Sequence, residues 1–220
     1  DAREDALYLA RDRIGVKPLY VHDDGQRMVF GSELKALWPA LAHKPGMDLE
    51  AIHHYLTFNY VPAPWTAFEG VRHVMPGTWQ RYTRGGGVQV QRWWNLADQR
   101  EQDHTFDAWA EEFMALLDDA TRIRLRADVP FGAFLSGGVD SSTIVGLMAR
   151  HVNEPVKTFC IGFEDPRYDE SAFALQAAQR FGCAHTAEVA ELNMLGRWPH
   201  VLHHLDQPHG DASFICLLYT

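Results

Sequence analysis

The fold of the second half of the chain is decided by the stretch Leu135-Ser136-Gly137-Gly138-Val139-Asp140-Ser141-Ser142. It follows the apolar run Pro130–Leu135, which predicts a short strand, and leads into Ser142–Val152, which predicts a helix. The N–H groups at the start of a helix lack intrahelical partners, and the helix dipole favours negative charge there. A strand, a Gly-rich loop and a helix in this order therefore indicate a site for an anion.

The chemistry of the loop suits a phosphate group. Gly137 and Gly138 lack a Cβ and allow positive φ, so the backbone can approach an oxyanion closely. Serine hydroxyls at three positions of the loop add donors. The loop has no lysine and so is not a Walker loop, but Asp140 could hold a Mg²⁺ ion that offsets the phosphate charge. A tight β–α turn with polar caps is the alternative interpretation.

The polar stretch Asn95–His104 predicts a linker, after which strands and helices alternate. Helical spacing of apolar residues begins at Phe106. The later predicted segments are strands at Thr158–Phe163 and His185–Val189 and helices at Ser171–Phe181 and Met194–Leu205. This alternation predicts an α/β unit with a parallel sheet covered by helices on both faces.

The first half predicts antiparallel strands and few helices. The expected strands are Ala6–Ala10, Pro18–Val21, Arg27–Gly31, Thr78–Thr83 and Val88–Trp94, with hairpin turns at 22–26 and 84–87. Ser32 is predicted to cap a short helix, Glu33–Leu37, which Pro39 ends. Asp48 is predicted to cap a second helix, Leu49–Thr57.

Composition narrows the class of protein. Hydrophobic residues at 46% and charged residues at 22% are typical of a globular chain and exclude a disordered or fibrous one. A net charge of −9 argues against a generic nucleic-acid binder, which needs a basic surface. Three cysteines without a C-x-x-C pair favour a reducing, cytoplasmic location. No segment approaches the ~18 apolar residues of a membrane span.

The loop residues Ser136–Ser142 resemble the pyrophosphate loop of the ATP pyrophosphatases, which include asparagine, argininosuccinate, GMP and NAD synthetases and tRNA-modifying thiolases. The first half narrows this choice, because Leu9–Tyr20 and Phe30–Leu37 resemble late segments of the glutaminase domain of glutamine-hydrolysing asparagine synthetases. Further similarity to that family follows in order at Tyr60–Pro64, Phe68–Val71, Met75–Gly77, Asp128–Leu135, Thr158–Phe163 and Asp169–Ser171. The resemblance runs from about Leu7 to Ser213.

The resemblance implies a fold of two joined parts, α/β and α+β. Residues 1–96 would form the C-terminal half of an antiparallel, β-rich glutaminase domain of the N-terminal-nucleophile type. Residues 97–220 would begin a parallel-sheet ATP-pyrophosphatase domain, similar to adenine nucleotide α-hydrolases. We expect a fragment that is inactive alone, because the family's N-terminal cysteine would precede Asp1 and its second acidic motif would follow Thr220. No catalytic residue is therefore assigned within the chain.

The function implied by the resemblance is ATP-dependent, glutamine-dependent amidation of a carboxylate, with aspartate as the first candidate. The reaction would pass through an acyl-adenylate and release AMP and pyrophosphate. The implied cofactors and substrates are ATP, Mg²⁺, glutamine and aspartate or another carboxylate. The resemblance implies no nucleic-acid or membrane partner, and it is compatible with a homodimer of the parent protein. Asp140 would be the metal ligand, and the backbone at Ile161 would meet the adenine. The residues that would hold the ATP phosphates are Leu135, Ser136, Gly137, Gly138, Val139, Asp140, Ser141 and Ser142.

Other polar residues match the family with less specific roles. Asp169 and Glu170 precede a predicted helix, and helix capping is the favoured explanation. Gln207 stands where the family usually has glutamate, and this change of charge argues against an ionic role at residue 207. Cys216 stands where the family often has proline, so the resemblance ends at about Ser213. Four residues resemble family positions near the domain interface, although a surface charge network is favoured for them: Arg11, Asp12, Arg13 and Lys17.

Three alternatives remain open at this point. One alternative is a metal cluster, although a polar helix end is favoured for the residues concerned: His200, His203, His204, Asp206 and His209. Ser32-Glu33-Leu34-Lys35 matches the S-x-x-K of serine acylases without the partner motifs of that class. At the level of function, the alternatives are a non-catalytic ATP-binding module and an ATP pyrophosphatase acting on another acceptor such as tRNA; the net charge weighs against tRNA.

Overall fold

The computed structural model describes residues 1–84, 87–99, 103–189, 196 and 198–210 of the 220-residue chain. These residues form two compact units. The first unit combines residues 1–99 with residues 198–210, and the second contains residues 103–189. The domain division at residue 96 stays a prediction, and the return of residues 198–210 to the first unit was not anticipated from the sequence.

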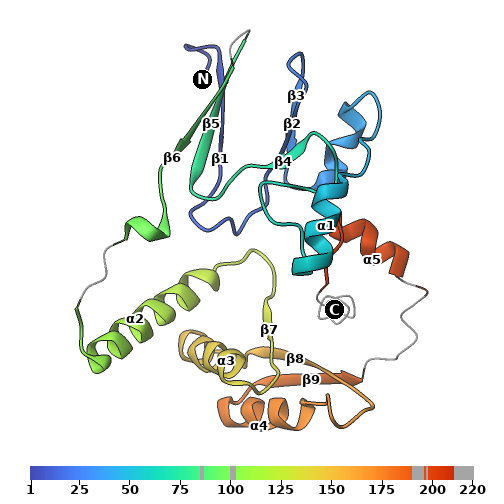
Figure 1. Ribbon diagram of the computed structural model, residues 1–220. Helices are drawn as coiled ribbons and strands as arrows, with labels where there is room; N and C mark the ends of the chain where they lie inside the picture. The colour runs from blue at the N-terminus through green and yellow to red at the C-terminus, as the bar shows by residue number, and fades with distance from the viewer. Residues whose placement is uncertain (85–86, 100–102, 190–195, 197, 211–220) are drawn as a thin grey trace. The chain divides into compact units, whose positions relative to one another are not determined.

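The first unit contains two antiparallel sheets of three strands each (Figure 1). One sheet has the order β1-β5-β6, made of Ala6–Ala10, Thr78–Thr83 and Val88–Arg92. The other has the order β3-β2-β4, made of Met28–Gly31, Tyr20–Asp23 and Val71–His73. The two predicted hairpins, β2–β3 and β5–β6, are confirmed.

Two short 3₁₀ helices follow β3, η1 (Leu34–Ala36) and η2 (Trp38–Ala40). Two predictions in this region are wrong. Ser32 does not cap η1, since Glu33 occupies the N-cap position and its side chain makes no capping bond. Pro39 does not end a helix but lies in the first turn of η2, where a missing N–H has no intrahelical partner to lose.

The helix α1 (Leu49–Phe58) begins as predicted. The Asp48 carboxylate accepts the N–H of Ala51 at 3.1 Å, which satisfies one of the free donors of the first turn. The helix ends at Asn59, whose φ of 62° is left-handed, a conformation that asparagine tolerates better than most residues. Farther along, a third 3₁₀ helix, η3 (Leu96–Asp98), lies within the predicted linker.

One of the buried core clusters of the first unit surrounds η1. Leu34 and Leu37 are fully buried and pack with Tyr20 and Val71 of the β3-β2-β4 sheet. Burying two leucines removes roughly 2–3 kcal/mol of unfavourable hydration per side chain, so η1 is held chiefly by its apolar residues. The helix α5 (Trp198–Leu205) also belongs to this unit and buries Val201. The first residues of the predicted helix Met194–Leu205 lie largely outside the described residues.

The second unit contains a parallel three-stranded sheet of order β7-β8-β9, which confirms the predicted α/β class. Its elements are α2 (Phe106–Arg124), β7 (Gly132–Phe134), α3 (Val139–His151), β8 (Lys157–Gly162), α4 (Ser171–Phe181) and β9 (Ala184–Val189). No helix in the described part of the chain is long and apolar enough to cross a membrane.

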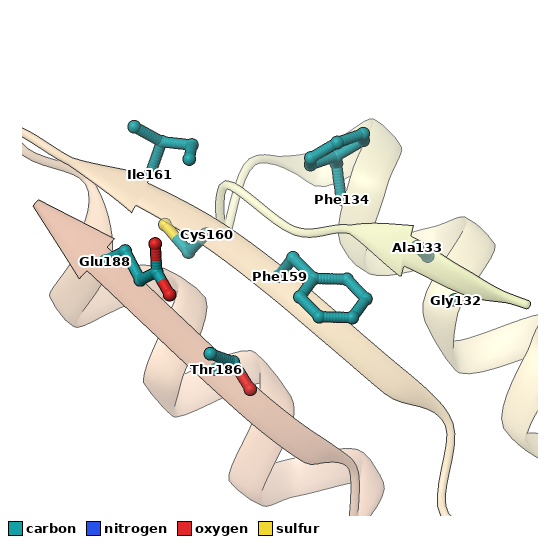
Figure 2. Close-up of a pocket in the computed structure, with 8 residues that line it drawn as sticks. All are labelled: Gly132, Ala133, Phe134, Phe159, Cys160, Ile161, Thr186 and Glu188. Carbon is teal, nitrogen blue, oxygen red and sulfur yellow. The ribbon is translucent and has the colours of Figure 1, made fainter. Parts of the chain in front are cut away.

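The prediction that helices cover both faces of this sheet is wrong for the residues described. Val145 of α3 and Ala174 of α4 pack in one core cluster with Cys160 of β8, so both helices cover the same face. The side chains of Phe134 and Phe159 point to the opposite face (Figure 2) and are 48% and 37% exposed. This open face borders the Gly-rich loop.

Candidate functional site

The Gly-rich loop turns the chain directly from β7 into α3. Leu135 is buried under the loop, and its N–H donates to the carbonyl of Phe159 at 2.8 Å. The helix α3 begins at Val139, three residues earlier than predicted, with Gly138 at the N-cap position. No side chain caps this helix. The N–H groups of its first turn therefore have no side-chain acceptor, and the anion site at this position stays a prediction.

Two serine hydroxyls hold the shape of the loop. The Oγ atoms of Ser136 and Ser141 lie 3.1 Å apart, and the Ser136 N–H donates to the Ser141 Oγ at 3.3 Å. The Gly138 N–H donates to the Ser136 Oγ at 3.3 Å. These contacts close the loop on itself and hold its backbone in a curve before the start of α3.

Position 137 in this loop accepts only glycine. Its φ is 81°, in the left-handed region that L side chains rarely adopt. A Cβ added there would lie 2.4 Å from the backbone carbon of Phe173 in the first turn of α4. The close packing of the loop on α4 therefore depends on the missing side chain.

Asp140 lies in the first turn of α3 and is exposed, as is Val139 beside it at 82%. Among the described residues, no group of three or more His, Cys, Asp and Glu could hold a metal ion. One carboxylate beside a phosphate-binding loop fits Mg²⁺, which commonly binds through one or two carboxylates together with substrate phosphates and waters. The donor set thus fits a metal shared with a phosphate ligand rather than an all-protein metal cage.

A cavity of about 420 Å³ opens on the uncovered face of the parallel sheet (Figure 2). Figure 2 shows Phe134, Phe159 and Ile161 on the same side of the ribbon, and Glu188 and Thr186 standing beside them on β9. The cavity is lined by Gly132, Ala133, Phe134, Phe159, Cys160, Ile161, Thr186 and Glu188. Its volume and its aromatic, partly polar lining suit a nucleoside.

Ile161 offers its backbone to this site. The carbonyl of Phe159 points toward the β7 side, where it accepts the N–H of Leu135. Because the direction of N–H and C=O alternates along a strand, Ile161 points its own N–H and C=O to the same side. β7 ends at Phe134, so in the described part of the chain Ile161 has no strand partner there. One donor and one acceptor are thus offered side by side, which matches the edge of an adenine ring.

Four of the side chains around the cavity were not predicted from the sequence. Phe134, Phe159, Thr186 and Glu188 were not singled out, although each belongs to a strand that was predicted. The alternation of faces along β8 could have found Phe159, because it shares the face of Ile161. The register that pairs Ile161 with Glu188 could not be obtained from one sequence.

One of the two acidic residues before α4 makes hydrogen bonds to the first turn of that helix. The Asp169 carboxylate accepts the N–H of Ser171 at 3.2 Å and its hydroxyl at 2.9 Å, which confirms the capping interpretation for Asp169. The hydrogen bonds from Ser171 are the main cause that lowers the pKa of Asp169. Glu170 occupies the N-cap position without a side-chain capping bond.

The charged segment after β1 is organised by its backbone more than by ion pairs. The Arg11 guanidinium donates to the carbonyls of Lys17 at 3.1 Å, Val74 at 2.8 Å and Gly15 at 3.1 Å. The Asp12 carboxylate accepts the N–H groups of Val16 at 2.9 Å and Lys17 at 3.1 Å. In place of the surface charge network favoured from the sequence, Arg11 and Asp12 make side-chain-to-backbone bonds that hold the loop after β1 and connect it to Val74.

The histidines of α5 form ring contacts with one another. The ring centroids of His200 and His204 lie 4.5 Å apart at an interplanar angle of 75°. Edge contacts of this kind are ordinary for neighbouring rings on one face of a helix. With no metal-binding group of three ligands in the described residues, the polar helix end remains the better interpretation.

The second unit is thus an α/β unit with a Gly-rich loop before an uncapped helix start, joined in one chain to an antiparallel β unit. Residues 1–94 match the model of the glutamine amidotransferase domain, and residues 112–220 match the model of asparagine synthase. The chain therefore belongs to the family of glutamine-hydrolysing asparagine synthetases.

Relatives support this assignment along nearly the whole chain. The chain is 32% identical over 215 residues to asparagine synthetase (glutamine-hydrolyzing) 1 of Bacillus subtilis strain 168. The aligned region covers 97% of this chain and 34% of the relative. It is 33% identical over 183 residues to asparagine synthetase (glutamine-hydrolyzing) 3 of the same organism, covering 79% of this chain and 29% of the relative. It is 29% identical over 233 residues to Amidase chyE of Penicillium rubens, and this alignment covers 97% of this chain and 34% of the relative. The chain spans about a third of the length of these curated relatives.

Proposed function

We propose that the parent chain is a ligase that transfers the amide nitrogen of glutamine to a carboxylate, with aspartate as the acceptor and asparagine as the product. A carboxylate oxygen of the acceptor attacks the α-phosphorus of ATP, and the bond to the β-phosphate oxygen breaks. Pyrophosphate leaves, and an acyl-adenylate remains. Ammonia released from glutamine then attacks the acyl carbon, the bond to AMP breaks, and the amide forms with loss of a proton to solvent.

The single observation that carries this proposal is the uncapped start of α3 behind a curved Gly-rich loop. We assign the phosphates of ATP to the loop residues 136–142, chiefly to the first-turn N–H groups of α3 (residues 139–141) and to the hydroxyls of Ser136 and Ser141. A pyrophosphate leaving group is stabilised by such fixed donors as its charge develops. Asp140 would hold Mg²⁺, which would supply further charge neutralisation for the same phosphates.

The nucleoside is assigned to the cavity on the open face of the sheet. Adenine would meet the N–H and C=O of Ile161, and its ring would pack near Phe134 and Phe159. This arrangement selects adenine over guanine, because guanine presents its donor and acceptor at that edge in the opposite order. The apolar lining would also keep water away from a reactive adenylate.

The experiment that tests the proposal measures pyrophosphate release by the full-length parent protein. We expect release with Mg²⁺-ATP and aspartate when either glutamine or ammonium supplies nitrogen, and asparagine formed in equal amount to pyrophosphate. Absence of pyrophosphate with every nitrogen source would overturn the ligase assignment. Because one relative is named an amidase rather than an asparagine synthetase, other carboxylates are tested in parallel, and release with one of them but not with aspartate would replace the acceptor only.

A further inference from the structure

The segment of residues 198–210 belongs by sequence to one part of the chain and by contact to the other. The asparagine synthase model matches residues 112–220, which include this segment. In the structure it packs within the first unit, which the amidotransferase model matches, and Val201 of α5 is only 2% exposed there. A segment with this double membership is continuous with the nucleotide unit and anchored to the amidotransferase unit.

Asp206 is the main anchor of the segment. Its carboxylate accepts the backbone N–H groups of Leu34 at 2.7 Å and Lys35 at 3.3 Å, and the Lys35 Nζ at 3.1 Å. The Asp206 side chain is only 8% exposed. A single carboxylate 171–172 residues away along the chain thus caps η1, which no local side chain caps.

Two further bonds continue the attachment. The Gln207 Oε1 accepts the N–H of Ala67 at 3.3 Å, and the Gly210 N–H donates to the carbonyl of Asn59 at 2.7 Å. Gly210 is packed so closely that an added Cβ would lie 2.5 Å from the Cβ of Asn59. The bond of Gln207 needs only an acceptor oxygen, so glutamine serves there without the charge of the family's usual glutamate.

Lys35 lies between two carboxylates of very different burial. Its Nζ lies 2.8 Å from the Glu33 carboxylate, which is 61% exposed, and 3.1 Å from that of Asp206. An exposed ion pair of the Glu33 kind contributes little. Removing the buried carboxylate would leave the backbone N–H groups of Leu34 and Lys35 without their acceptor, which costs more than losing a surface pair.

We infer that Asp206 is a coupling residue that links the state of the nucleotide unit to the amidotransferase unit through η1. The inference rests on the proposed function. A shift of residues 198–210 would displace the Asp206 carboxylate and so act on Leu34, which is fully buried in the core of the amidotransferase unit. Coupling requires two states with different contacts, and the cap of η1 is the contact that can be made or broken. Asp206 touches no substrate and acts as a positioning residue.

The test compares Asp206→Ala with the wild type in the full-length parent protein. The readout is the number of glutamine molecules hydrolysed per pyrophosphate released, measured with saturating ATP and acceptor. We expect this ratio to rise about fivefold or more in Asp206→Ala, the lower end of usual coupling factors, while pyrophosphate release driven by ammonium changes less than about twofold. Glu33→Gln removes only the exposed partner of Lys35 and is expected to leave the ratio at the wild-type value.

The outcomes separate the inference from the proposed function. A wild-type protein that releases no pyrophosphate would overturn both. A wild type that couples normally, together with an unchanged ratio in a folded Asp206→Ala protein, would overturn the inference and leave the proposed function intact. If Asp206→Ala does not fold, Lys35→Met and Asp206→Asn, which preserve part of the contact, are measured instead, and unchanged ratios in both would equally overturn it.

Discussion

Gly137 lies against the backbone of Phe173, so that the Gly-rich loop and the first turn of α4 pack with no room for a Cβ between them. The two residues belong to different elements of the parallel-sheet unit, and the position of Gly137 is fixed by its positive φ as well as by this contact. The Gly-rich loop, to which we assign the phosphates of ATP, is in this way supported by the neighbouring helix α4.

Gly137→Ala is expected to destabilise the unit by about 2–4 kcal/mol, because it adds left-handed strain to a backbone clash. Gly138→Ala is the matched control. Its φ is −67° and its added Cβ would meet only the Ser136 Oγ at 3.3 Å, so it should be tolerated. Thermal and denaturant unfolding of both variants measures the difference, and equal stabilities would contradict the account of this loop.

Asp140→Ala is expected to abolish Mg²⁺-ATP binding, because Asp140 is the one carboxylate in the first turn of α3. Asp128→Ala changes an exposed carboxylate before the loop and serves as the control, with affinity within about twofold of the wild type. Isothermal titration with a non-hydrolysable ATP analogue, with and without Mg²⁺, measures both. An Asp140→Ala protein with unchanged affinity would show that the residue holds no metal.

Asp48→Asn should lower stability in a pH-dependent way. The N–H of Ala51 is the main cause that lowers the pKa of Asp48, so the carboxylate is favoured in the folded state. The stability it contributes is therefore present above the usual Asp pKa of about 3.9 and is lost as pH falls through the lower folded value. Urea unfolding from pH 7 to pH 3 should show the two proteins converging at low pH. A constant difference would mean that capping charge is not involved.

His73 should make the first unit sensitive to mild acid. Burial lowers the pKa of His73 to about 4, Arg11 adds to the shift, and the ring lies 4.5 Å from that of Tyr20. Because the unfolded chain binds the proton more readily, stability is lost as pH falls from about 6.5 to 4, by roughly 2–3 kcal/mol in total. His73→Gln should remove this part of the pH dependence. An unchanged slope between pH 6.5 and pH 4 would show that His73 is not the group responsible.

Local signals in the sequence predicted local structure well. Asp48 caps α1, the hairpins form at the expected turns, and the loop connects β7 to α3, because each depends on residues within a few positions of one another. The cap of η1 was predicted at Ser32 and is made by Asp206, since a buried carboxylate brought by the fold competes with a local hydroxyl. No periodicity in one sequence carries that information.

The candidate site also has one part that the local sequence predicts and one part that depends on the fold. The type and order of the serines and glycines in the loop are sufficient to predict an anion site there. Glu188 and Thr186 enter the cavity only through the register of β9 on β8, which is set by pairing across the sheet. The uncovered face escaped prediction for a related reason, because alternation of elements gives their number but not the face on which each helix packs.

The bond between Leu34 and Asp206 also has a consequence for biosynthesis. During translation, η1 leaves the ribosome long before its capping carboxylate, which follows 172 residues later. At the usual rates of synthesis this interval is roughly 10 to 35 s. Throughout that time the amidotransferase unit must keep Leu34 buried without its acceptor or remain open at this edge. Its folding can be completed only after the strands β7, β8 and β9 of the neighbouring unit have been synthesised.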